Sequence, residues 1–147
     1  MPDSALIRGY ILGFDFGLRR IGVAIGQTAT HTASALETVR HGKSPDWRAI
    51  DRLVSEWAPT VLLVGLPLGA EGEETDMSRA ARRFGVALQK RYLLEVAFAD
   101  ERLSSHAAAS RFVELRESGN LRRKDASQLD AISARIILEN WLQSFHD

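Results

Sequence analysis

The chain has 147 residues, of which 45% are hydrophobic and 26% are charged. This length and composition argue against disorder and predict one folded domain spanning residues 1–147. Basic and acidic residues balance to a net charge of zero, so any affinity for nucleic acid must come from local basic patches. The absence of cysteine excludes disulfides and thiolate zinc sites.

The sequence gives no sign of a membrane or secretory segment. No apolar run approaches the roughly 18–20 residues needed to cross a bilayer. Residues 1–4 lack the basic and apolar regions of a signal peptide. We therefore expect a cytoplasmic protein that makes no membrane contact.

The first forty residues have the pattern of strands. Short runs rich in Ile, Val, Ala and Thr predict strands over residues 10–16, 20–26 and 32–38. The turn between the first two strands is too short for a crossover connection, so we expect these successive strands to be antiparallel.

Helical and strand patterns alternate from residue 44 onward. Ser44 and Pro45 predict the N-cap and first residue of a helix that ends before Pro59. Continuous apolar runs then predict buried strands over 60–65 and 93–99.

Three further helices are expected. One lies between the two buried strands, with an apolar face from Met77 to Leu88, and a second is capped by Ser104. The last runs to about Gln143 and starts with Asp125 and Gln128 at the spacing of a capping box. The complete order predicts an α/β domain, in which a mixed five-stranded sheet with its first three strands antiparallel is flanked by helices.

Carboxylates at the edges of three apolar elements are candidates for one shared site. Asp15 lies within the first strand, Glu101 follows the fifth, and Asp130 lies one turn into the last helix. Each alone could be an ordinary turn, ion-pair or boundary residue. If they converge to within ~5 Å, each pair repels by about 3 kcal/mol at an effective dielectric of ~20, so the cluster needs a counter-charge. Ligand sets made only of oxygen favour Mg²⁺ or Mn²⁺ over zinc.

Two of these positions have a competing neighbour. Adjacent strand residues point to opposite faces, so only one of Asp100 and Glu101 can join the cluster, and Glu101 is preferred. Asp125 competes with Asp130, but capping suits Asp125 better, which leaves Asp130 for the site.

Four motifs carry a resemblance that covers residues 12 to 142. They are FDFGLRRIGVA (14–24), VGLP (64–67), DERLSS (100–105) and DAISA (130–134). In order and spacing they resemble the YqgF/RuvX family of RuvC-like nucleases, within the ribonuclease H-like superfamily. The resemblance implies the sheet described above and a metal-binding, catalytic triad that maps onto Asp15, Glu101 and Asp130, holding two Mg²⁺ or Mn²⁺ ions. Family members are assigned to 5′-end processing of the 16S ribosomal RNA precursor, and a Holliday-junction resolvase role has also been proposed for them.

Basic residues near these motifs are candidates for substrate phosphates. Arg20 lies beside the proposed site, and Arg123 and Lys124 precede the Asp130 helix. Each could equally be a solvated surface charge. The loop over 69–76 carries four acidic residues, so its glycines are not read as a phosphate cradle.

The leading hypothesis is therefore a metal-dependent nuclease. Its partners would be structured RNA, with pre-ribosomal particles, or branched DNA if the protein is a Holliday-junction resolvase. A non-catalytic RNA- or ribosome-associated binding module is the other alternative. A phosphotransferase related to actin and the sugar kinases is disfavoured, because 147 residues leave no room for the second lobe that closes over ATP.

Overall fold

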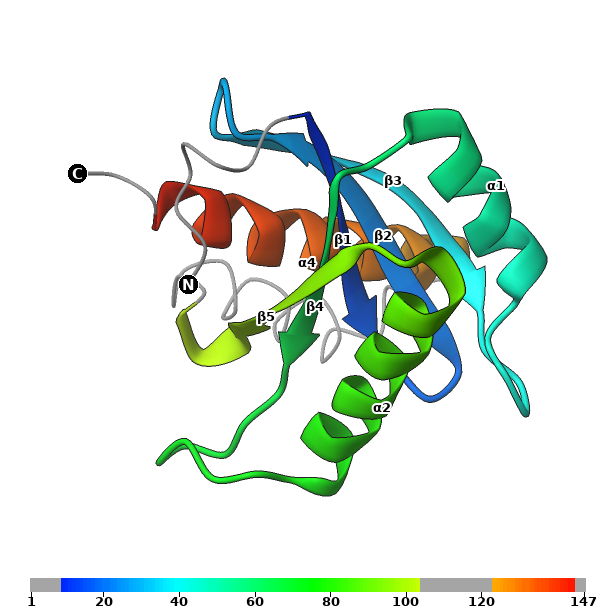
Figure 1. Ribbon diagram of the computed structural model, residues 1–147. Helices are drawn as coiled ribbons and strands as arrows, with labels where there is room; N and C mark the ends of the chain where they lie inside the picture. The colour runs from blue at the N-terminus through cyan, green and yellow to red at the C-terminus, as the bar shows by residue number, and fades with distance from the viewer. Residues whose placement is uncertain (1–8, 104–122, 145–147) are drawn as a thin grey trace.

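The computed structural model describes residues 9–103 and 123–144, with side chains over 9–102 and 128–144. Five strands form one sheet in the order β3-β2-β1-β4-β5 (Figure 1). They are β1 (Tyr10–Phe16), β2 (Arg20–Gln27), β3 (Thr32–Arg40), β4 (Val61–Leu66) and β5 (Glu95–Asp100). The first three are antiparallel, and β4 and β5 run parallel to β1. The predicted mixed sheet is confirmed.

Helices cover both faces of this sheet. They are α1 (Trp47–Trp57), α2 (Asp76–Tyr92) and α4 (Arg123–Gln143), and a short 3₁₀ turn, η2 (Glu101–Leu103), follows β5. Figure 1 shows α1 and α2 on one face and α4 across the other. The helix expected after Ser104 lies outside the described residues. None of the helices that are described is long and apolar enough to cross a membrane.

The two faces of β1 have different neighbours, because successive side chains of a strand point in opposite directions. Leu12, Phe14 and Phe16 belong to the apolar cluster packed against α1 and α2. Ile11 belongs to the second cluster, which includes Leu138 of α4. Asp15 is four residues after Ile11, so its side chain points to the same face of the sheet, the one covered by α4.

Two predicted helix starts are wrong. The N-cap of α1 is Asp46, whose side chain accepts a hydrogen bond from the Ala49 amide, and not Ser44. Pro45 instead forms an isolated bridge with His41, which draws the chain back toward the end of β3 before the helix begins. Helix α4 begins at Arg123, so Asp125 lies inside its first turn and is not its cap. An acidic residue in the first turn is still favourable in general, because that turn is the positive end of the helix dipole.

Candidate active site

A glycine on β2, next to Asp15, lets the backbone of α4 at Asp130 approach the sheet. In the antiparallel pairing of β1 with β2, Asp15 lies directly opposite Gly22, so both positions share one face of the sheet. A Cβ at Gly22 would overlap the backbone carbonyl of Asp130 on α4. The absent side chain therefore lets α4 approach the sheet beside Asp15, and Asp130 lies at the point of closest approach.

A second glycine makes room for Glu101 on the other side of Asp15. The parallel register of β1 and β4 pairs Phe14 with Val64, so the next position places Gly65 beside Asp15. A Cβ built on Gly65 would lie 3.0 Å from Oε1 of Glu101. Gly65 thus leaves space over the sheet that the Glu101 side chain fills, and this side chain is hydrogen-bonded to that of Asp15.

The Asp15–Glu101 contact is electrostatically costly without a cation. Burial raises the pKa of the Glu101 carboxyl group above its usual range; the hydrogen bond with Asp15 lowers this pKa in part, and the charge of Asp100 raises it. Two carboxyl groups can form a hydrogen bond only if one of them keeps a proton. A divalent cation between them would replace that proton, which is the usual coupling of metal binding to proton release.

Asp100 has a different environment from its neighbour. Its carboxylate pairs with the Arg102 guanidinium at 2.6 Å and accepts a hydrogen bond from the Arg102 backbone amide. The hydrogen bonds from Arg102 hold the pKa of Asp100 below its usual range. Arg102 also donates to the backbone carbonyl of Ala70, which ties Asp100 to the acidic loop between β4 and α2. Of the two adjacent acids, Glu101 is the one that contacts Asp15.

The Asp130 carboxylate is held by Arg20. Nε of Arg20 lies 2.7 Å from Oδ2 of Asp130, and the Asp130 side chain is only 16% exposed. The same oxygen is buried without a hydrogen bond of acceptable angle, so the contact is a close charge pair that leaves the acceptor poorly satisfied. Among the described side chains, no three acidic or histidine groups are arranged to hold a metal ion. Asp15 and Glu101 therefore meet, while Asp130 lies over the same row of the sheet with its carboxylate turned to Arg20.

All three acids fit a hard divalent cation in chemistry, and Asp15 and Glu101 also fit it in position. Asp15 and Glu101 supply two adjoining carboxyl groups in a partly buried site, and Asp130 offers a buried, underused oxygen nearby. No sulfur or imidazole ligand competes within the described part of the chain. Completing a three-carboxylate site requires Asp130 to exchange Arg20 for the cation.

The basic residues expected to bind substrate are only partly placed. Arg20 lies at the start of β2, with a side chain 45% exposed beside Asp130. Arg123 and Lys124 lie in the first turn of α4, on the helix that carries Asp130. Their side chains fall outside the described residues, so their contact with phosphate stays a prediction.

The sequence reading did not single out Gly22 and Gly65, although both determine how the acids meet. A glycine inside a β-strand is a known sign of close approach by another backbone or side chain. Gly22 and Gly65 each interrupt an otherwise apolar strand, so this signal was available. Which element approaches each glycine could not be read from the sequence, because it depends on how α4 crosses the sheet.

Replacing Glu101 with Gln is expected to stabilise the metal-free protein near neutral pH. The pKa of Glu101 is higher in the folded protein than its ordinary value of 4.5. Below pH 4.5 the group is protonated in both states and does not destabilise the fold, but as the pH rises through the folded-state pKa the buried group must ionise, and this lowers the free energy of unfolding. Glu101→Gln should therefore melt at a higher temperature than the parent at pH 8 in EDTA, with the difference vanishing near pH 4.

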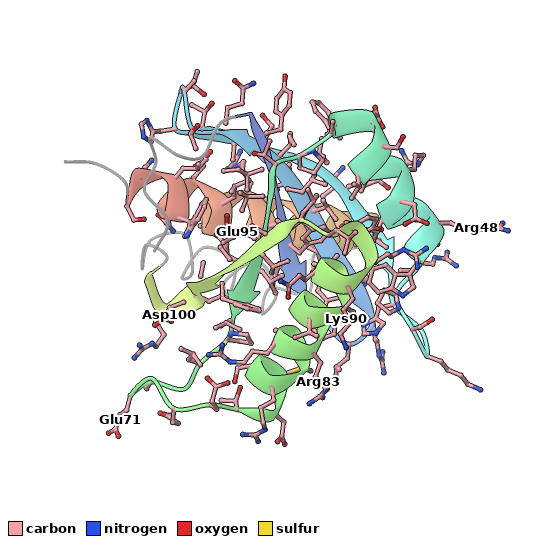
Figure 2. All side chains as sticks on the ribbon, in the orientation of Figure 1. Arg48, Glu71, Arg83, Lys90, Glu95 and Asp100 are labelled. Carbon is pink, nitrogen blue, oxygen red and sulfur yellow. The ribbon has the colours of Figure 1, made fainter. Side chains whose placement is uncertain are left out.

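The matched control for this experiment is Glu71→Gln. Glu71 projects into solvent from the loop before α2 (Figure 2), so its replacement should leave the melting temperature unchanged at both pH values. An equal melting temperature for Glu101→Gln and the parent at pH 8 would contradict the strained carboxyl pair.

Solved structures define the class to which this fold belongs. Thermus thermophilus RuvC in complex with a Holliday junction substrate matches with a TM-score of 0.54 and 16% identity, over 92% of this chain and 94% of that one. The yeast mitochondrial Holliday junction resolvase matches with a TM-score of 0.53 and 12% identity, over 93% and 79%. At such identities the likeness concerns the fold alone, and it identifies a RuvC-type, ribonuclease H-like fold.

Sequence comparisons identify the family within that class. The family model RuvX, described as Holliday junction resolvase, matches residues 9–144. A Xylella fastidiosa protein (strain M23) named "Putative pre-16S rRNA nuclease" is 47% identical over 145 residues, 97% of this chain and 94% of its own length. A Xanthomonas euvesicatoria protein of the same name is 44% identical over the same extent. The chain belongs to the RuvX family, and these matches support a nuclease, that is, a phosphodiester hydrolase.

Proposed function

We propose that this protein is a divalent-metal-dependent nuclease that processes the 5′ end of precursor 16S ribosomal RNA in the cytoplasm, on free RNA or pre-ribosomal particles. The observation that carries the proposal is the hydrogen bond between the side chains of Asp15 and Glu101. Asp15 lies between the positions of Gly22 and Gly65 on the neighbouring strands, and Asp130 of α4 lies over Gly22. Such a pair stores unfavourable charge that a cation relieves, and it lies at the end of β1, beside an exposed arginine. The names of the relatives support the choice of RNA.

In this proposal Asp15, Glu101 and Asp130 hold two Mg²⁺ or Mn²⁺ ions. Such ions, when bound, supply activation of a water molecule and stabilisation of the departing oxygen. The water oxygen forms a bond to phosphorus, the bond from phosphorus to the 3′ oxygen breaks, and that oxygen takes a proton. The products carry 5′-phosphate and 3′-hydroxyl ends.

Arg20 has two roles in succession in this scheme. In the metal-free protein it neutralises Asp130 at 2.7 Å. When Asp130 turns to a cation, the guanidinium is released next to the site, where its planar donors can hold a phosphate oxygen of the substrate.

A second candidate function is resolution of branched DNA. It is favoured by the description of the matching family and by the fold likeness to RuvC. Both functions use the same acids and differ in the nucleic acid that reaches them, so substrate preference separates the two.

The test compares cleavage of a precursor 16S RNA fragment, a four-way DNA junction and a linear DNA duplex, each with Mg²⁺, with Mn²⁺ and in EDTA. We expect metal-dependent cleavage of the RNA near the mature 5′ end and little cleavage of either DNA. Preferred cleavage of the junction would move the assignment to a resolvase. Binding of the RNA with no cleavage under any condition would instead identify a non-catalytic module.

A further inference from the structure

Two arginines lie directly opposite each other at the end of the sheet nearest the acids. The antiparallel register of β2 and β3 pairs Arg20 with Arg40, so their side chains leave the same face at neighbouring positions. That face is the α4 side, because Arg20 is two residues from Gly22 and contacts Asp130. Like charges directly opposite across two strands are destabilising unless an anion lies between or near them.

The described side chains supply only half of the negative charge that this pair needs. Asp130 pairs with Arg20. Arg40 is exposed and has no ion-pair partner within residues 9–102 and 128–144. By contrast Glu37, three residues earlier, is on the opposite side of β3 and is bound to Arg52 of α1 at 2.8 Å. Counted over the described side chains, the pair therefore has one anion too few on the face that carries the acids.

The backbone around the two arginines is held in place by His41. Its Nδ1 lies 2.7 Å from the carbonyl oxygen of Gly17, and its backbone amide donates to the carbonyl of Arg19 at 2.9 Å. Its ring also packs on Phe16, with centroids 5.0 Å apart. These contacts hold the end of β3 against the turn between β1 and β2, so the backbone positions of Arg20 and Arg40 are fixed relative to each other.

A hollow of about 490 Å³ lies between β3, the strand that carries Arg40, and α4. Its lining includes Thr38, two residues before Arg40, and Ala131, which follows Asp130. The rest of the lining comes from Ala35, Leu36 and Glu37 of β3 and from Gln128 and Ile132 of α4. Its volume falls in the range of small-molecule sites, roughly 300–1,000 Å³, which is sufficient for one nucleotide.

We propose that Arg40, together with Arg20, binds a backbone phosphate of a nucleic-acid strand whose neighbouring nucleotide occupies the hollow between β3 and α4. The inference rests on the proposed function, because the same strand would pass the acids. Positions two residues apart along a strand are separated by about 7 Å, so Arg20 and Arg40 lie one step beyond the row of Asp15 and Gly22. Phosphate contact by Arg40 would fix which bond of the strand lies over the acids.

Binding is tested without catalysis, by fluorescence anisotropy of a short labelled single-stranded RNA in EDTA. Arg40→Gln is expected to weaken binding roughly tenfold. It should also reduce the slope of log affinity against log salt by about 0.7, the value for one lost phosphate contact on a single strand. Arg40→Lys should keep the salt slope and recover part of the affinity, because it keeps the charge without the guanidinium fork.

The matched control is Arg48→Gln. Arg48 is also exposed without an ion-pair partner in the described part of the chain, but it projects from the start of α1, which covers the face of the sheet opposite α4 (Figures 1 and 2). This substitution makes the same charge change and should alter affinity less than twofold. Equal losses for Arg40→Gln and Arg48→Gln, or no loss for Arg40→Gln, would overturn the proposal.

A DNA strand of the same sequence identifies the group that Arg40 contacts. Phosphate recognition predicts the same fold-loss on RNA and on DNA, whereas a loss confined to RNA would mean contact with a 2′-hydroxyl and would overturn the phosphate assignment. The binding and cleavage measurements show separately whether this inference or the proposed function fails. If the parent cleaves RNA and Arg40→Gln binds normally, only this inference fails. If nothing is cleaved and Arg40→Gln binds weakly, only the enzymatic proposal fails.

Discussion

Asp15→Asn is expected to lower metal-dependent cleavage by roughly 1,000-fold or more. The carboxylate of Asp15 contacts Glu101 and lies beside the glycine over which Asp130 is seated, so it is the common neighbour of both other acids. An amide of the same shape keeps the packing but removes one negative charge from the proposed cation site. The charge stabilisation that bound metal ions supply amounts to several kcal/mol, and each 1.4 kcal/mol corresponds to about tenfold in rate.

Asp76→Asn is the matched control for this prediction. Asp76 lies in the first turn of α2 with a fully exposed side chain whose partner is Arg79, so its loss should change the rate less than twofold. Mn²⁺ binding measured by calorimetry gives a second readout, in which Asp15→Asn should lose binding and Asp76→Asn should keep it. Undiminished cleavage by Asp15→Asn, in a preparation free of other nucleases, would remove the acids from the mechanism.

The sheet and part of the candidate site could be predicted because their signals are local. The short apolar run over residues 10–16 predicted β1 with its observed bounds, Tyr10–Phe16. The short turn behind it required an antiparallel neighbour, and the single acid inside its apolar run indicated where unusual chemistry lay. The position of Glu101 at the end of β5 then followed from chain order, since β5 runs parallel to β1.

What could not be predicted depends on contacts between distant elements. The pairing of Arg20 with Asp130 joins β2 to α4 across more than one hundred residues, and nothing local in either segment requires it. The pairing of Arg20 with Arg40 depends on the irregularity of β3 opposite Val23 and Ala24, which shifts the register by one residue. A sequence pattern places residues on a face, but it does not determine which partner a charged side chain takes.

Gly22→Ala is expected to damage stability and the candidate site together. The new Cβ would overlap the backbone of Asp130, and a helix backbone cannot move aside as a flexible side chain can. Helix α4 would have to lift from the sheet, loosening the cluster that includes Leu138 and Trp141. We expect a loss of about 3 kcal/mol in the free energy of unfolding, the upper range for overpacking, and a melting temperature lower by roughly 10 °C.

The response to Mg²⁺ tests the candidate site separately from stability. If α4 lifts, Asp130 moves away from Asp15, so the increase in melting temperature that saturating Mg²⁺ gives the parent should shrink or vanish in Gly22→Ala. Gly42→Ala is the control, because a Cβ there meets nothing within 4 Å, and it should keep both the melting temperature and the Mg²⁺ response. A full Mg²⁺ response in a destabilised Gly22→Ala protein would show that cation binding does not need α4 at this distance. Asp15 and Glu101 would then be the essential pair, and Asp130 would serve only to hold Arg20.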